Sequence, residues 1–437
     1  MTGVEVTRVF SALAGTERAE ARFIGGCVRD ALAGTPVADI DIATPLPPEH
    51  VIRRLEAAGI KAVPTGLAHG TVTAVAGRST FEITTLRRDL ACDGRHAVVE
   101  FTDDWRADAA RRDFTINALS CRPDGTLFDP FDGAADLKAG KVRFIGPAAD
   151  RIAEDVLRIL RFFRFHARFG RGQPDAAALA ACRDAAPRLT TLSGERVRTE
   201  LFKLLVLDTC PAVWRRMVNE GVLTPLLPAA ADTRRLKRLI AIDRELGVPA
   251  AGRAVVRLAA LLPNGQRETV MAAAKRLRLS NAERDRLLAL VDPPVRPRWR
   301  DAPILRRRHL LRLADSELYL DLLYLDAAAA RAAPPLFEDW TDAFDAVGEW
   351  DCARFPLTGQ DALDASVPPG PEIGRLLTEV KHWWADYAYQ PDHAACVREL
   401  RRRLALIGSA PPESHAESRS DRPRANEFPA LIRNHTD

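Results

Sequence analysis

The chain changes its hydrophobic pattern once, and that change limits the folds open to it. Over residues 1–146, short strand-like runs alternate with helical patterns. Two of these runs, Thr71–Ala76 and Thr80–Leu86, predict neighbouring strands joined by a hairpin-like connection. From Ala149 onward, apolar residues recur at helical spacing and the strand signals fade. We therefore expect an α+β fold, with a mixed head followed by an all-helical remainder.

The 437 residues are enough for roughly two to four domains. Proline clusters and changes of pattern indicate where the domains divide. The expected segments are a head (1–146), a helical neck (147–215), a helical body (216–295), a helical tail (296–407) and a disordered terminus (408–437). The terminus is expected to be disordered because Ser, Pro and alternating charges dominate it.

Composition narrows the class of protein. Apolar residues make up 47% of the chain and charged residues 28%, as in ordinary globular proteins, which argues against a wholly disordered chain. No run approaches the roughly 18 apolar residues that cross a bilayer, and the N-terminus lacks a secretory pattern, so we expect a cytoplasmic protein without membrane spans. The seven cysteines are scattered and never spaced C-x-x-C, which disfavours a disulfide framework and a structural zinc site.

Residues 23–44, FIGGCVRDALAGTPVADIDIAT, carry the most specific chemistry. Gly25 and Gly26 lie between a predicted strand and a predicted helix, where a backbone without side chains can approach a phosphate group closely. Arg29 follows about one helical turn later and can pair with phosphate oxygens. These residues are therefore candidates for nucleotide binding.

Asp39 and Asp41 flank Ile40 on a predicted strand, so their carboxylates share one face. Two like charges held close together are costly without a cation between them, which suggests Mg²⁺. Metal ions on paired aspartates can activate an attacking hydroxyl and stabilise a leaving pyrophosphate. Glu82 is either a third metal ligand or a solvent-facing residue, and the alternation along its strand does not decide between the two.

A Gly-Gly pair or a D-x-D motif alone is weak support, but their order and spacing favour phosphoryl or nucleotidyl transfer. A HAD-type phosphatase also begins with D-x-D. It requires a strongly apolar strand before the motif, where this chain has Gly34-Thr35-Pro36, so that class is disfavoured. Walker-A and G-x-G-x-x-G patterns are absent, which leaves P-loop and Rossmann proteins without support.

Further motifs follow in the chain. They are His69-Gly70-Thr71-Val72, a strand around Glu82, and Arg111-Arg112-Asp113. With the first segment, they resemble class II tRNA nucleotidyltransferases and bacterial poly(A) polymerases of the polymerase-β-like superfamily. The resemblance implies a nucleotidyltransferase head with a small mixed sheet, in which Arg112 and Asp113 hold the incoming sugar and triphosphate. Asn117, one turn beyond Asp113, is expected to support that carboxylate by a hydrogen bond.

The resemblance extends to residues 154–165, where the pattern E-D-x-x-R-x-x-R-x-x-R is predicted as one helix. On such a helix Asp155 and Arg158 share a face, either as a plain salt bridge or as a base-reading pair. A carboxylate that accepts from an amino group, beside a guanidinium that donates to a ring nitrogen, suits cytosine and adenine but not uracil or guanine. In the resembling family this motif is the amino-acid template. Arg161 and Arg164, on the next turns, are candidates for nucleotide or primer contact.

Residues 195–201 resemble a further family motif that buttresses the template helix, or else they form ordinary surface ion pairs. The arginine clusters at 296–308 and 401–403 are candidates for binding the phosphates of the tRNA backbone. Alternatively, they are solvated surface residues. No protein partner is evident.

The function implied by the resemblance is template-independent addition of C, C and A to the 3′ end of tRNA from CTP and ATP. Asp39 and Asp41 would be the catalytic metal ligands, and the helical tail would bind tRNA. The loop around Asp93-Gly94-Arg95 favours full CCA addition. A poly(A) polymerase, an enzyme that adds only CC or only A, and a non-catalytic RNA-binding protein are the alternatives.

Overall fold

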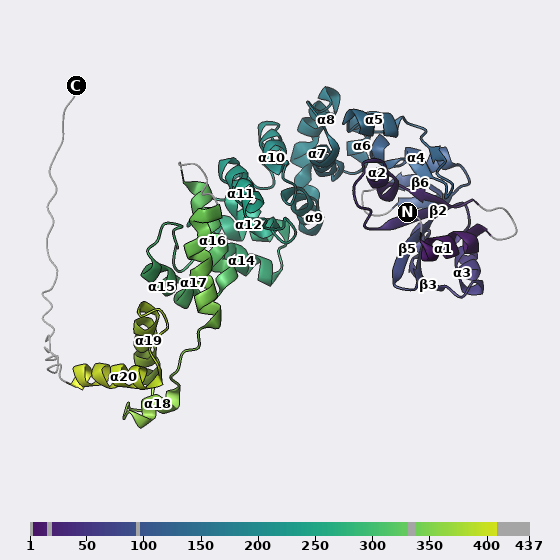
Figure 1. Cartoon of the computed structure of the whole chain (residues 1–437). Helices are drawn as coiled ribbons and strands as arrows, with labels where there is room; N and C mark the ends of the chain where they lie inside the picture. The colour runs from purple at the N-terminus through teal and green to yellow at the C-terminus, as the bar shows by residue number, and fades with distance from the viewer. Residues whose placement is uncertain (1–2, 15–19, 93–96, 331–336, 409–437) are drawn as a thin grey trace, which may run out of the picture. The chain divides into compact units, whose positions relative to one another are not determined.

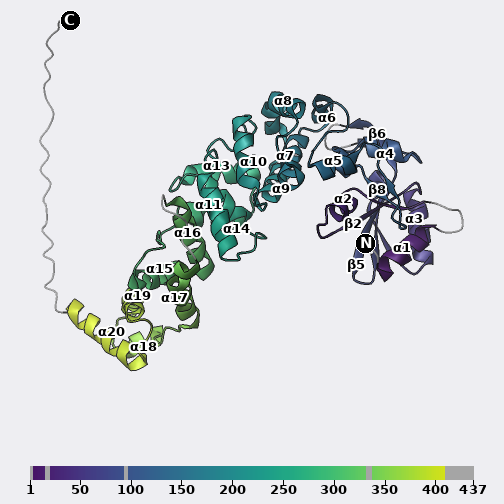
Figure 2. The same cartoon turned by 45° about the horizontal axis from the view of Figure 1, so that its top comes forward.

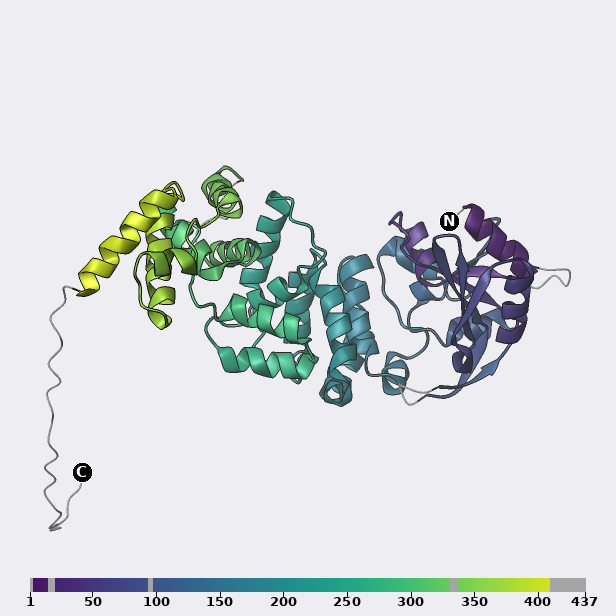
Figure 3. The same cartoon turned by 90° about the horizontal axis from the view of Figure 1, so that it is seen from below.

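The computed structural model describes residues 3–14, 20–92, 97–330 and 337–408. The chain divides into two compact units, residues 1–351 and 352–437. Strands occur in the purple-to-blue N-terminal part, and the described residues that follow form helices (Figure 1), which confirms the predicted α+β class. The view in Figure 3 shows the same separation of strands from helices. Within the described ranges, no helix is long and apolar enough to cross a membrane.

The head contains a seven-stranded mixed sheet with the strand order β3-β4-β5-β2-β1-β8-β9. Its strands are β1 (Arg22–Ile24), β2 (Ile40–Thr44), β3 (Lys61–Gly66), β4 (Thr71–Ala76), β5 (Ser79–Thr85), β8 (Ser120–Cys121) and β9 (Leu127–Phe128). Strands β2 and β5 pair in parallel, whereas the other pairings of this sheet are antiparallel. The predicted hairpin is confirmed as β4-β5, with Ala76 opposite Ser79.

A separate two-stranded sheet follows, made of β6 (Arg87–Cys92) and β7 (Ala97–Phe101). The loop around Asp93-Gly94-Arg95, which favours full CCA addition by its sequence, joins these strands and lies outside the described residues.

Helices α1 (Val4–Ala14) and α3 (Pro48–Ala57) pack against one face of the large sheet. Their apolar side chains form a buried core with Ile42 of β2 and Ile83 of β5. Successive side chains of a strand point to opposite faces. Asp41 and Glu82, the chain neighbours of these two isoleucines, therefore point to the other face, away from that core.

Short helices complete the head, and longer ones form the neck and body. The head, neck and body helices are α2 (Gly26–Leu32), α4 (Trp105–Ala110), α5 (Gly133–Ala139), α6 (Ala148–Glu154), α7 (Arg158–Phe169), α8 (Ala176–Ala185), α9 (Gly194–Leu205), α10 (Cys210–Asn219), α11 (Arg234–Glu245), α12 (Ala254–Leu261), α13 (Arg267–Leu277), α14 (Asn281–Val291), α15 (Pro303–Leu313), α16 (Ser316–Ala329) and α17 (Thr341–Cys352). Single 3₁₀ turns are η1 (Leu67–His69), η2 (Thr115–Asn117), η3 (Ala186–Thr191) and η4 (Phe337–Trp340).

One apolar core runs from the end of the head into the body. It begins at Phe114 and Phe144 and continues through α7 and α9 as far as Ala346 of α17. Helices α7, α8 and α9 lie beside one another in Figures 1 and 2. Helices α15 and α16, which belong to the segment expected as tail, contribute Leu310 and Leu323 to this same core.

Residues 352–437 form the second unit, with helices α18 (Gly359–Asp364), α19 (Pro371–Asp386) and α20 (His393–Gly408). Its small core contains Leu376, Val380, Trp384 and Leu400. The terminus expected to be disordered lies, from residue 409 on, outside the described residues.

Candidate active site

The Gly-Gly turn connects β1 to α2 as the sequence predicts. Gly25 has φ 66°, a backbone conformation that glycine adopts without strain, and its N–H donates to the carbonyl oxygen of Leu119 at 2.9 Å. A Cβ at Gly25 would lie only 2.8 Å from Nη1 of Arg112. The glycine therefore lets a guanidinium lie directly against the turn.

The three candidate metal ligands lie on two neighbouring strands or directly before one of them. Asp41 of β2 is in register with Glu82 of the parallel strand β5, so both side chains are on the same face of the sheet. Asp39 precedes β2 and is exposed, as is Glu82, whereas Asp41 is half-buried. Burial and the Glu82 carboxylate raise the pKa of Asp41; Arg112 opposes this and Asp39 adds to it. The carboxylates thus repel one another in the absence of a cation.

The arrangement fits a site with two protein carboxylates better than a closed protein cage. Among the residues described, no group of three or more His, Cys, Asp or Glu side chains is placed to hold a metal by itself. Mg²⁺ is usually held by one or two carboxylates and completes its coordination with water and substrate phosphates. Asp39 and Asp41 provide oxygen ligands of that kind, with Glu82 beside them.

Arg112 supplies positive charge next to these carboxylates. Its guanidinium donates to the Asn117 carbonyl oxygen at 3.4 Å and to Oδ2 of Asp108 at 3.3 Å, and its side chain keeps 20% of its surface exposed. Sequence reasoning missed Asp108, which is buried on α4 and also binds Arg111. The i, i+4 spacing of Asp108 and Arg112 was the signal that could have found it.

Arg29, expected at the phosphates, lies instead between head and neck. Its guanidinium donates to Oδ1 of Asn117 and pairs with Asp30 at 2.7 Å. It also lies over the rings of Phe165 and Phe169 on α7, at 5.0 and 4.7 Å from the ring centroids. Only 6% of Arg29 is exposed, so in this structure it links α2 to α7.

Asp113 is also buried, and its partners belong to both head and neck. It accepts hydrogen bonds from the Phe114 backbone and from Nδ2 of Asn117, both at 2.9 Å, which confirms the predicted support by Asn117. Arg161 of α7 pairs with it at 2.6 Å. Burial alone would raise the pKa of Asp113, but Arg161 and these hydrogen bonds outweigh it and lower the pKa.

The helix predicted over residues 154–165 is wrong at its start. Helix α6 ends at Glu154, Asp155 is extended (φ −150°, ψ 107°), and α7 begins at Arg158. Oδ1 of Asp155 accepts from the Leu157 backbone at 3.1 Å, and such local bonds compete with helix continuation. Asp155 and Arg158 therefore do not share a helix face.

Neither residue of the predicted pair is bonded to the other. Oδ2 of Asp155 pairs with Arg196 of α9 at 2.7 Å. Arg158 pairs with Glu154 at 2.5 Å and donates to the Arg151 carbonyl oxygen at 2.7 Å. The plain salt bridge considered for this pair is thus absent, although both side chains remain at the junction of α6 and α7.

Arg161 and Arg164 are held by a residue of the segment 195–201, for which the sequence predicts either a motif that buttresses the template helix or surface ion pairs. Glu200 of α9 is buried and accepts from Arg164 at 2.5 Å, with Arg161 at 3.8 Å. Arg164 also lies 4.2 Å from the centroid of the Phe165 ring. Glu200 and Arg196 both belong to the segment 195–201, so this segment contacts the neck arginines and Asp155.

The arginine cluster at 296–308 is partly structural. Arg306 is buried and donates to the carbonyl oxygens of Asp301 and Trp299, and Arg296 donates to that of Val291. At 401–403, Arg402 and Arg403 pair with Glu399, and Arg401 and Arg402 are exposed. Arg401 thus keeps the exposure that an RNA contact requires.

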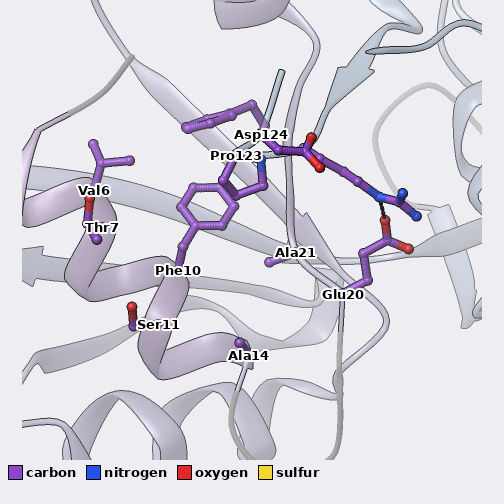
Figure 4. A pocket seen from close by; sticks show the side chains of 11 residues that line it. Val6, Thr7, Phe10, Ser11, Ala14, Glu20, Ala21, Pro123 and Asp124 are labelled. Carbon is purple, nitrogen blue, oxygen red and sulfur yellow. Dashed lines mark hydrogen bonds and ion pairs between the residues drawn. The ribbon is translucent and has the colours of Figure 1, made fainter. Parts of the chain in front are cut away.

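A cavity of about 500 Å³ lies away from all these residues, between α1, β1 with the two residues before it, and the turn 122–124 that follows β8 (Figure 4). Its wall is mostly apolar, with Val6, Phe10 and Phe23, and the ion pair of Glu20 with Arg122 lies at its side. None of the candidate catalytic side chains lines it, so it contributes nothing to the site.

The head sheet and the helices that follow have the architecture of a polymerase-β-like nucleotidyltransferase. Residues 21–143 match the family model described as the poly A polymerase head domain. Residues 173–233 match the one described as the probable RNA- and SrmB-binding site of polymerase A.

Known proteins define the family more narrowly. CCA tRNA nucleotidyltransferase 1, mitochondrial, of Danio rerio is 36% identical over 375 residues, which cover 85% of this chain and 84% of that protein. The CCA-adding enzyme of Streptococcus sanguinis is 32% identical over 83% of this chain and 88% of its own. The crystal structure of the Bacillus stearothermophilus CCA-adding enzyme in complex with CTP aligns with a TM-score of 0.72 and 26% identity, covering 92% of this chain and 98% of that one. The chain belongs to the CCA tRNA nucleotidyltransferase family, whose members are enzymes that use divalent metal ions.

Proposed function

We propose that this protein adds C, C and A in turn to the 3′ end of tRNA, from CTP and ATP and without a nucleic-acid template. The observation that carries the proposal is the register of Asp41 with Glu82 on one face of the sheet, with Arg112 beside them at the Gly25 turn. Family membership supports the same reaction.

Asp39 and Asp41 are the proposed ligands of Mg²⁺, and Glu82 lies where it can assist. When bound there, Mg²⁺ supplies positive charge that favours ionisation of the tRNA 3′-hydroxyl and neutralises the leaving pyrophosphate. Arg112 binds the triphosphate of the incoming nucleotide, because a guanidinium matches phosphate oxygens in charge and geometry. Gly25 and Gly26 let the nucleotide approach the backbone.

Asp155 and Arg158 are the proposed base-reading residues, although not as neighbours on a helix. Asp155 accepts from the amino group of cytosine or adenine, and Arg158 donates to the adjacent ring nitrogen. Uracil and guanine present a carbonyl oxygen to Asp155 and an N–H to Arg158, which leaves charges unpaired and costs about 1–3 kcal/mol. Arg196 fixes the carboxylate of Asp155 by their 2.7 Å ion pair.

In this proposal Asp113, Arg29 and Arg161 act chiefly by joining head to neck. They connect the Gly25 turn, which faces the phosphates, to α7, which carries the base-reading arginine. Arg164 pairs with Glu200 of α9 within the neck. Tail binding of tRNA and a cytoplasmic location are part of the proposal.

The experiment is an extension assay on three tRNA transcripts, ending before CCA, after CC, and after CCA, with each nucleotide supplied separately. We expect two C additions on the first transcript with CTP, one A addition on the second with ATP, and none on the third. Repeated A addition on all three would indicate a poly(A) polymerase. Extension of only the first or only the second would indicate a split activity, and RNA binding without extension a non-catalytic protein.

A further inference from the structure

A second cavity, of about 600 Å³, lies at the outer side of the junction between head and neck. It is formed by the end of α2, by α5 and by the end of α7 with the two residues that follow. Its volume falls in the range of small-molecule sites. The candidate metal ligands and Arg112 do not line it.

The cavity combines positive charge with an apolar floor. Lys138, Arg168 and Arg171 lie around it, and Leu137 and Phe169 form part of its wall. Arg168 pairs with Asp30 at 3.2 Å. Lys138 and Arg171 are exposed and have no ion-pair partner among the residues that the structure describes.

The position of Arg171 is fixed rather than free. Its backbone N–H donates to the Gly140 carbonyl oxygen at 2.8 Å, which ties the end of α7 to the end of α5. Its side chain lies so close to Gly140 that a Cβ there would meet Cγ of Arg171 at 2.5 Å. The Arg171 guanidinium at the rim of the cavity is therefore attached to a side chain that is held in place near its backbone.

Interactions with helix dipoles explain only part of the positive charge around the cavity. Lys138 is in the last turn of α5 and Arg168 in the last turn of α7, where cations interact favourably with the helix C-terminus. Arg171 lies beyond the end of α7, and Leu32 at the cavity keeps 51% of its surface exposed. A ligand with an anionic part and an apolar or planar part accounts for both the cation beyond the helix end and the exposed apolar surface at the cavity.

We propose that this cavity is a second phosphate-binding site, distinct from the nucleotide site at Gly25, which takes a phosphate attached to a nucleoside. Lys138, Arg168 and Arg171 bind the phosphate, and Phe169 and Leu137 contact the sugar or base. The phosphate comes either from a free nucleotide or from the backbone of bound RNA.

The site is close enough to affect the junction. Helix α2 has seven residues and spans about 10 Å, with Gly25 before one end and Leu32 at the other. An anion on Arg168 competes with Asp30, which also pairs with Arg29. Occupancy therefore changes the charge balance around Arg29, which lies over Phe169.

The test compares the full-length wild type with Lys138→Glu/Arg171→Glu and with a control, Arg267→Glu/Lys275→Glu. The control changes net charge equally at two exposed residues of α13 that do not line the cavity. Equilibrium dialysis with radiolabelled CTP gives the number of bound equivalents. The salt dependence of tRNA affinity gives the number of phosphate contacts.

If a free nucleotide is the ligand, wild type and control bind two equivalents of CTP and the cavity variant binds one. If RNA is the ligand, all three bind one equivalent, and the cavity variant loses roughly tenfold in tRNA affinity with a salt slope lower by about 2. Identical CTP stoichiometry and identical salt slopes in variant and control would overturn the proposal. Extension of a transcript ending in CC, measured at saturating tRNA, stays at the wild-type rate, so failure of this site leaves the proposed function untouched.

Discussion

At the residue scale, Asp41 is half-buried and lies on the same sheet face as Glu82, with Asp39 two residues before it. Its pKa is raised by burial first and then by the Glu82 carboxylate. A carboxyl group whose folded-state pKa lies above the unfolded value costs stability while it is ionised, and that cost disappears as the pH falls through the folded-state pKa. The carboxylate charge that the proposed metal binding requires thus weakens the metal-free fold.

We therefore expect Asp41→Asn to raise the Tm of the metal-free protein at neutral pH. The difference from wild type should shrink as the pH is lowered into the range where Asp41 protonates. Thermal unfolding in EDTA at a series of pH values measures this difference in Tm, and Asp103→Asn, at an exposed residue, is the control. A lower Tm for Asp41→Asn at neutral pH would contradict the electrostatic account.

In the proposed function, Asp155 is the residue on which base choice depends. Replacing it by Ala removes the acceptor for the amino group of cytosine and adenine, so discrimination against UTP and GTP should fall by about 10- to 100-fold. Competition assays with mixed nucleotides measure the ratio, and Asp150→Ala on α6 is a matched exposed control. A variant still confined to CTP and ATP would exclude Asp155 as a base reader.

At the scale of elements, the sequence predicted the parts of the head that depend on local pattern. The strand–Gly-Gly–helix unit, the β4-β5 hairpin and the strand carrying Asp41 are all confirmed, because glycines and strand alternation are local signals. The facing of Glu82 toward Asp41 was open in the sequence, since it depends on the parallel pairing of β2 with β5.

The neck was predicted less well because tertiary partners decide it. The helical spacing of apolar residues continues past Asp155. The Asp155 carboxylate, however, accepts a hydrogen bond from the Leu157 backbone and pairs with Arg196 of α9, and the helix is interrupted there. The spacing of Arg29 from Gly26 predicts that its guanidinium contacts a phosphate. The aromatic rings of α7, more than 130 residues away in the chain, place it at the junction instead.

Because Arg196 of α9 pairs with Asp155, we can predict the effect of replacing Arg196. Arg196→Ala should lower both the rate of CTP incorporation and the discrimination against UTP, because Asp155 loses the partner that orients it. Arg198→Ala on the same helix is the control, since it loses an ion pair of the same 2.7 Å length that joins α9 to Glu283 of α14 and does not involve Asp155. Partial recovery of discrimination by Arg196→Lys would support a positioning role, and equal effects of the two Ala variants would argue against it.

At the scale of the whole molecule, buried charges help to hold the body together. Asp243 and Asp321 are buried, and both pair with Arg253, the former at 2.8 Å. Arg286 of α14 reaches Asp321 at 2.5 Å. These pairs join α11, α14 and α16 within unit 1.

Removal of one partner from such a network leaves uncompensated buried charge. We expect Asp321→Ala to destabilise the protein by about 3–5 kcal/mol. Glu317→Ala, which removes an exposed partner of Arg286, should cost no more than about 1 kcal/mol. Urea unfolding followed by circular dichroism measures both, and equal losses would show that burial of the network contributes little.

The most direct test of the account is the mass of the product made from a tRNA transcript that lacks CCA, when all four nucleotides are present together with Mg²⁺. We predict a single added mass of two cytidylates and one adenylate, with no longer product and none from Asp41→Asn, which should still bind tRNA. Incorporation of uridylate or guanylate by the wild type, a run of adenylates, or undiminished extension by Asp41→Asn would contradict it.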